Sequence, residues 1–208
     1  MQTFRQYITE LTKPAGLSDL KNKLDSKVDK VDARNSSWVG SVVDYLASFE
    51  FKKIGSGKYA SVFAHPKYPY ALKIFMKDSA YLRWIEFAQS NQSNPYVPKL
   101  RGKVVKITSN VFAIRIEKLK RVSGSAYSKF DEEYRKCISD KNYTSDDENL
   151  NDVFAEFKKN KKLLDLHGEN VMSRGSQLVV LDPYYNWFGK KEPGKFMIDP
   201  NEINTSVF

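Results

Sequence analysis

The most constraining feature of the chain is the polar segment Asp165-Leu166-His167-Gly168-Glu169-Asn170, which directly follows the apolar pair Leu163-Leu164. Twelve residues after Asn170, a second apolar run, 178–181, ends at Asp182. Both apolar segments therefore lead into a carboxylate. Oxygen donors of this kind suit Mg²⁺, which keeps several waters and bridges phosphate groups. The spacing favours a phosphate-handling site in the second half of the chain.

A glycine-containing segment upstream is a candidate phosphate cradle. Gly55-Ser56-Gly57 lies between two predicted strands, and the segment continues through Ala60 to Val62. Glycines let backbone N–H groups approach phosphate oxygens with no Cβ in the way. We therefore predict that Gly55, Gly57 and Val62 contribute to nucleotide binding. A plain glycine-containing hairpin turn is the alternative interpretation.

Lys73 is the candidate cation for these phosphates. It lies within the apolar segment Ala71-Leu72-Lys73-Ile74, where a charged side chain must leave the buried face or find a charged partner. Glu86, on the helix predicted over 79–89, is the best-placed acid. We predict that Glu86 pairs with Lys73 in the nucleotide site. An ordinary exposed glutamate is the alternative.

The hydrophobic pattern predicts an α+β chain with five strands and one helix inserted after the third strand. The strands are expected near 49–54, 60–63, 70–75, 104–107 and 111–116. Helical faces are expected at 18–31, 36–49 and from Leu150 onward, and 123–149 is expected to form a helix followed by a loop. We divide the chain into an N-terminal helical cap at 1–48, a sheet domain at 49–120 and a third domain at 121–208 that carries the Asp165–Asn170 segment.

These segments together resemble the protein-kinase-like superfamily. The segments "FKKIGSGKYASVFAHPKYPYALKIF", "LDLHGENVM", "VVLDP" and "FMIDPNEI" are similar in particular to the early serine/threonine protein kinases of T7-like bacteriophages. The resemblance runs from about residue 49 to 203. It implies a two-lobed kinase-like fold, with a five-stranded antiparallel sheet in the N-terminal lobe, a reduced helical C-terminal lobe and N-terminal helices.

The resemblance also implies roles for the candidate residues, with ATP and Mg²⁺ as cofactors. Asp165 would orient or accept the proton of a Ser or Thr hydroxyl, while Asn170 and Asp182 would hold Mg²⁺. Lys73 would align the α- and β-phosphates. His167 occupies a position where protein kinases often carry a lysine. It would act near the γ-phosphate or brace the loop, and both interpretations remain open.

The hinge between the two lobes is expected directly after the strand that ends at Ile116. Glu117 would open this hinge, and backbone groups near Lys118 and Leu119 would meet adenine. The resemblance further implies a phage-encoded enzyme that phosphorylates host bacterial proteins early in infection.

The chain departs from common protein kinases in three places. Leu163-Leu164 stands where His-Arg normally precedes the catalytic aspartate, and Asp182-Pro183-Tyr184 replaces Asp-Phe-Gly. Only 26 residues follow Asp182, which leaves little chain for a substrate-binding helical lobe. We therefore expect a protein substrate, whose hydroxyl arrives on its own loop. The alternatives are a small-molecule kinase resembling the aminoglycoside phosphotransferases and a pseudokinase that acts as a binding module.

Composition excludes several other classes of protein. No apolar run approaches the roughly 20 residues that cross a bilayer, the N-terminus lacks a secretory signal, and the single cysteine, Cys137, forms no internal disulfide. We expect a cytoplasmic protein without membrane contact. The net charge of +9 arises from basic residues mixed with acidic ones, so nucleic acid is not an expected ligand.

Overall fold

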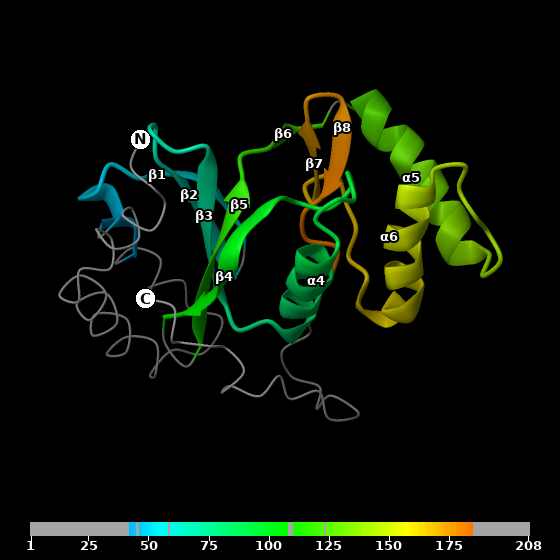
Figure 1. Ribbon diagram of the computed structural model, residues 1–208, viewed down its shortest axis with the longest axis horizontal. Coiled ribbons are helices and arrows are strands. Elements are labelled where there is room, and N and C mark those ends of the chain that lie inside the picture. The colour runs from blue at the N-terminus through cyan, green and yellow to red at the C-terminus, as the bar shows by residue number, and fades with distance from the viewer. Residues whose placement is uncertain (1–41, 45, 58, 108–109, 123, 185–208) are drawn as a thin grey trace. The chain divides into compact units, whose positions relative to one another are not determined.

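A computed structural model describes residues 42–44, 46–57, 59–107, 110–122 and 124–184 (Figure 1). The described chain forms two compact units. The first holds the described parts of 42–77 and 101–116, and the second those of 78–100 and 117–184. The helix expected at 18–31, half of the one at 36–49 and the "FMIDPNEI" segment lie outside the described residues. The predicted domains 1–48, 49–120 and 121–208 stay a prediction.

The first unit is built on a five-stranded sheet in the order β1-β2-β3-β5-β4. β1, β2 and β3 are consecutive antiparallel neighbours, and helix α4 (Ser79–Ser90) follows the third strand along the chain, as predicted. The strands are β1 (Lys52–Ser56), β2 (Ala60–Ala64), β3 (Tyr70–Met76), β4 (Leu100–Lys106) and β5 (Val111–Glu117).

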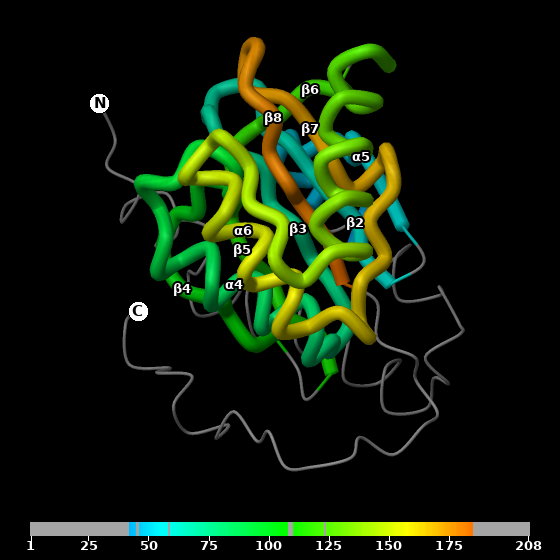
Figure 2. The backbone as a smooth tube through the Cα atoms, turned by 90° about the vertical axis from the view of Figure 1, so that its right-hand side faces the viewer, coloured from blue at the N-terminus to red at the C-terminus, as the bar shows by residue number. Residues whose placement is uncertain are grey.

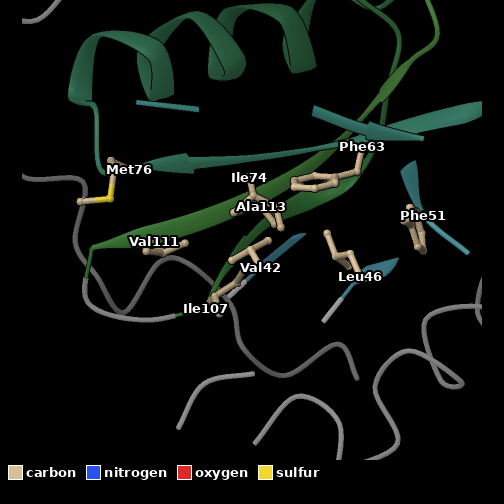
Figure 3. Packing of buried hydrophobic residues seen from close by; sticks show 9 residues of the cluster. All are labelled: Val42, Leu46, Phe51, Phe63, Ile74, Met76, Ile107, Val111 and Ala113. Carbon is tan, nitrogen blue, oxygen red and sulfur yellow. The ribbon is translucent and has the colours of Figure 1, made fainter. Parts of the chain in front are cut away.

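One face of this sheet carries a hydrophobic core that also includes the helical residues Val42 and Leu46 (Figure 3). Phe63 of β2 and Ile74 of β3 are each 1% exposed there. Alternating residues of a strand point to opposite faces of its sheet, so the core fixes which residues of β2 and β3 remain for the other face. That second face carries Val62 and Lys73.

The second unit combines a small sheet with helices (Figures 1 and 2). The sheet has the order β6-β7-β8 and consists of β6 (Lys120–Arg121), β7 (Val171–Arg174) and β8 (Gln177–Val180). Besides α4, the helices are α5 (Gly124–Ser139), α6 (Glu148–Lys159) and the 3₁₀ turn Lys161–Leu163. The helices α5 and α6 lie side by side, and Tyr134 packs edge-on against Phe157 with ring centroids 5.9 Å apart.

An aspartate begins each of the two 12-residue helices of the second unit. Asp78 accepts hydrogen bonds from the first turn of α4, and Asp147 does the same for α6. Such caps satisfy backbone N–H groups that have no partner inside the helix. Asp147 also accepts a 2.7 Å hydrogen bond from the Tyr96 hydroxyl through its second oxygen. Burial and this carboxylate raise the pKa of Tyr96 to about 12.

The structure extends the sequence-based picture in two places. β4 begins at Leu100 rather than near 104. The additional residues lack apolar alternation and include Gly102 at a φ of 71°, so the hydrophobic pattern did not mark them as part of the strand. The hairpin of β7 and β8 turns through Gly175 and Ser176, with Gly175 at a φ of 64°, a conformation that glycine adopts without strain.

None of the helices in the described part of the chain has the length and apolar character that crossing a bilayer requires.

Candidate active site

The segment from Asp165 to Asn170 is a tight loop that is closed by its own hydrogen bonds. The Asn170 N–H donates to the His167 carbonyl at 2.8 Å. The Asn170 side chain donates from Nδ2 to the backbone oxygen of Asp165, also at 2.8 Å. Asp165 and His167 are exposed and Asn170 is half-buried, so the loop is fixed internally while its polar side chains remain accessible.

The chain around Asp182 is tied to this loop by backbone hydrogen bonds. The Asp165 N–H donates to the Pro183 carbonyl at 2.9 Å, and the Leu181 N–H donates to the Asn170 carbonyl at 2.8 Å. Leu164 and Tyr184 form a further antiparallel bridge. One hydrogen bond thus lies on either side of Asp182 in sequence. The structure therefore brings together the three chain positions, Asp165, Asn170 and Asp182, that the spacing predicted to act as one site.

The amide of Asn170 has a defined orientation in this cluster. Its Nδ2 lies 2.8 Å from the Asp165 carbonyl and 3.1 Å from Nε2 of His167. A neutral imidazole has one acceptor nitrogen. The Glu169 N–H donates to Nδ1 of His167 at 3.3 Å, so whether Nε2 accepts from Asn170 depends on the tautomer of the ring. The hydrogen bond to the Asp165 carbonyl turns Nδ2 of Asn170 toward the loop in either case. Oδ1 accepts no hydrogen bond within the described residues and is the atom left for a ligand.

In the first unit, Gly55, Val62 and Lys73 lie in register across three strands. Gly55 of β1 is opposite Val62 of β2, which is opposite Lys73 of β3. Directly opposite residues of an antiparallel pair point to the same face, so Val62 and Lys73 share one face. Lys73 is 4% exposed. The sequence-predicted nucleotide residues of this unit therefore form one row.

The two glycines of the candidate cradle differ in their surroundings. A Cβ at Gly55 would lie 3.9 Å from Cβ of Val62, whereas a Cβ at Gly57 would meet nothing within 4 Å. The Gly57 N–H donates to the Ala60 carbonyl at 2.9 Å, closing the turn. Gly57 is thus suited to leave space beside the hairpin rather than to offer its own N–H.

Glu86 and Glu117, the two predicted acids, have different environments. Glu86 is exposed on α4, and its pairing with Lys73 in the other unit stays a prediction. The Glu117 carboxylate is 14% exposed and forms a salt bridge with Arg174. Leu119, the predicted adenine contact, is half-buried between β5 and β6.

Two residues beside the predicted site were not expected from the sequence. Arg174 lies 57 residues from Glu117 in the chain, so no local pattern could have linked them. The Tyr127 ring of α5 would lie 3.8 Å from a Cβ at Gly168. No sequence pattern marked this proximity of α5 to Gly168.

The donor set at the loop fits a magnesium ion that obtains most of its ligands from phosphate and water. Asn170 offers an amide oxygen and Asp182 a carboxylate on chain segments joined by hydrogen bonds. No cluster of three or more His, Cys, Asp or Glu side chains suited to a metal occurs within the described ranges. A metal enclosed by such protein ligands is therefore not indicated there.

Comparisons with known proteins give structural matches alone. No family model matches the chain, and a search of curated proteins found no match. One similar solved structure is Rad53 1-466 in complex with AMP-PNP, at 14% identity and a TM-score of 0.36, covering 64% of this chain and 38% of that one. Another is the Cydia pomonella granulovirus kinase PK-1, at 15% identity and a TM-score of 0.36, covering 71% and 58%. The chain thus spans less than two thirds of either protein.

The order of elements defines the fold class. A five-stranded antiparallel sheet with a helix after its third strand is followed by a small second sheet and few helices. The Asp165–Asn170 loop directly precedes the hairpin of that second sheet, and Asp182 directly follows it. This is a reduced protein-kinase-like α+β fold, and the fold class predicted from the sequence is confirmed.

Proposed function

We propose that the chain is an ATP- and Mg²⁺-dependent kinase that phosphorylates Ser or Thr hydroxyls of other proteins. The observation that carries the proposal is the hydrogen-bonded cluster of Asp165, Asn170 and the segment around Asp182. The row of Gly55, Val62 and Lys73 in the other unit supplies residue types that binding of a nucleoside triphosphate requires.

Asp165 is the residue that would orient the acceptor hydroxyl and take up its proton. Its backbone N–H and carbonyl are both held, by Pro183 and Asn170, while its side chain remains exposed. A carboxylate on a fixed backbone with a solvent-facing side chain can meet a hydroxyl that arrives on a flexible protein loop.

Asn170 and Asp182 would hold Mg²⁺, which when bound neutralises charge on the transferred phosphates. The contribution of the chain is orientation, because the contacts of Asn170 Nδ2 direct Oδ1 outward. Lys73 would align the phosphates from β3, and Gly55 and Gly57 would leave room for them. The backbone after Glu117 would meet adenine.

The setting follows from the resemblance to the kinases of T7-like phages. The enzyme would be phage-encoded, would act early in infection in the host bacterial cytoplasm, and would modify host proteins.

The test is phosphate transfer from γ-labelled ATP with Mg²⁺ to the proteins of a bacterial lysate. We expect labelled protein bands that disappear with Asp165→Ala and persist with Asp146→Ala, an exposed aspartate outside the site. Phosphoamino-acid analysis should show phosphoserine or phosphothreonine. ATP binding without any protein label would contradict the proposal, and would favour a small-molecule kinase if small acceptors are labelled and a pseudokinase if nothing is.

A further inference from the structure

Arg174, the last residue of β7, makes four side-chain hydrogen bonds near the candidate hinge. Its Nε donates to Oε2 of Glu117 at 2.7 Å, and its Nη2 donates to Oε1 of the same carboxylate. Its two terminal nitrogens also donate to the carbonyls of Pro95 and Val97, at 3.1 Å each. The guanidinium thus makes a two-pronged, charge-assisted contact with Glu117.

Glu117 is also fixed by Lys99. Its carboxylate accepts a 2.7 Å hydrogen bond from the Lys99 N–H, and its own N–H donates to the Lys99 carbonyl at 2.9 Å. Its side chain is 14% exposed, against 31% for Arg174. A carboxylate so far removed from water would be costly without its cation. Both the backbone and the side chain of Glu117 therefore have one defined position.

The chain after Glu117 is anchored again three residues later, at Lys120. Lys120 and Arg121 form β6, which pairs with Ser173 and Met172 of β7, and the Ser173 hydroxyl donates to the Lys120 carbonyl at 3.3 Å. Residues 118 and 119 form a short span between these two anchors. Within the described residues, Leu119 makes no backbone hydrogen bond, so its polar backbone groups remain for a ligand.

We propose that Arg174 is a positioning residue for recognition of the nucleotide base. By binding Glu117, it sets the direction in which the Leu119 backbone presents its hydrogen-bonding groups. The inference rests on the proposed function, because it takes this span as the adenine contact. It goes further by assigning base affinity to a residue of β7 that touches no ligand itself.

The strand that carries Arg174 begins next to Asn170, so one hairpin borders both the metal-site loop and the hinge. The two ends of the nucleotide can nevertheless be separated in experiment. Adenosine depends on the hinge alone, whereas inorganic tripolyphosphate with Mg²⁺ depends on the phosphate and metal residues. Loss of the contact between Arg174 and Glu117 should weaken binding of the first ligand and spare the second.

The experiment compares wild type with Arg174→Met, which keeps a long side chain and removes the charged donors. We expect the dissociation constant for adenosine to rise about tenfold or more, as misplacement of a contact group does, and that for Mg²⁺-tripolyphosphate to stay unchanged. In turnover assays, KM for ATP should rise while kcat at saturating ATP is retained. Glu117→Gln, which keeps an acceptor for Lys99, should shift adenosine binding in the same direction by less.

Arg135→Met is the matched control, because Arg135 pairs with Asp131 on an exposed face of α5. We expect this variant to bind adenosine and Mg²⁺-tripolyphosphate as wild type does. Equal weakening of adenosine and tripolyphosphate by Arg174→Met, or no change in either, would overturn the inference while leaving the proposed function intact. If Arg174→Met does not fold, Arg174→Lys and Glu117→Gln decide by the same comparison of two ligands. Wild-type protein that binds neither adenosine nor tripolyphosphate would refute the proposed function and the inference with it.

Discussion

At the scale of single residues, the hydrogen bonds of the Asn170 amide determine which of its atoms can contact a ligand. Its Nδ2 faces the Asp165 carbonyl and the His167 ring, and therefore Oδ1 faces away from both. An amide with free rotation would spend part of its time with the donor side outward. The neighbours of Asn170 thus orient its side chain, as hydrogen bonds to metal-binding side chains do in other proteins.

Replacing His167 by Ala should weaken the apparent affinity for Mg²⁺ more than it lowers kcat. The Asn170 amide would lose its contact with the imidazole ring, and we expect the Mg²⁺ concentration for half-maximal activity to rise about 10- to 100-fold. The measurement is a magnesium titration of kinase activity, with Glu169→Gln, an exposed neighbour in the same loop, as control. An unchanged magnesium requirement together with a lower kcat would instead support action near the γ-phosphate, the other interpretation of His167.

Gly57→Ala separates the role of a missing side chain from the stability of the hairpin. A Cβ there meets no atom within 4 Å, so we expect an unchanged melting temperature but a higher KM for ATP, because the methyl group would occupy space proposed for phosphate. Gly124→Ala is the control, since a Cβ at the start of α5 also meets nothing within 4 Å. Wild-type KM in Gly57→Ala would favour the plain hairpin turn.

At the scale of elements, α6 is joined to the segment around Tyr96 through its capping residue. One oxygen of Asp147 caps the helix and the other accepts from the Tyr96 hydroxyl. Ionised tyrosine would place two negative charges in contact. Burial and this contact hold the pKa of Tyr96 at about 12, above the ordinary 10.0. A folded-state pKa that is raised in this way favours the neutral form.

Tyr96 should therefore make stability fall in alkaline solution. The favourable difference is complete below the unfolded-state pKa of 10.0 and is lost as pH rises through about 12. We expect the urea midpoint of wild type to fall more between pH 9 and pH 12 than that of Tyr96→Phe, which cannot ionise there. Parallel falls in the two proteins would show that other groups control alkaline unfolding.

The strands of the first sheet could be predicted from the sequence because their residues alternate between two faces. β2 and β3 are local patterns of this kind, and the register that aligns Val62 with Lys73 follows from them. β6 could not be predicted in this way, since it consists of Lys120 and Arg121 alone. It is a strand only because β7, some fifty residues later, pairs with it.

The same distinction applies to the candidate site. Asp165 and Asn170 are close in sequence, so their spacing carried enough information to predict one loop. The salt bridge of Arg174 with Glu117 joins residues 57 positions apart, and arginine in a short strand is otherwise ordinary. Nothing local marks such a pair, which is why the sequence could suggest a hinge after Ile116 but not the contact between Arg174 and Glu117.

At the scale of the whole molecule, each of the two units carries some of the residues that we propose bind nucleotide. Lys73 and the glycines belong to the first unit, while Asn170, Asp182 and the proposed hinge after Glu117 belong to the second. A ligand that binds the folded chain stabilises it by mass action, because the unfolded chain has no such site. Thermal unfolding with and without nucleotide therefore tests the proposed binding.

Mg²⁺-ATP at about 100 times its dissociation constant should stabilise the protein by about 2.7 kcal/mol, which corresponds to a rise in melting temperature of roughly 5 to 10 °C for a chain of this size. Removal of the proposed metal ligands by Asn170→Ala or Asp182→Asn should abolish the part of this rise that depends on Mg²⁺. Their response to adenosine alone should be retained, because the hinge is intact. Asn142→Ala, in an exposed turn, should respond as wild type does. If Asn170→Ala and Asp182→Asn both keep the full Mg²⁺-dependent rise in melting temperature, the metal binds elsewhere. The assignment of Asn170 and Asp182 as metal ligands is then wrong, even where ATP binding itself is confirmed.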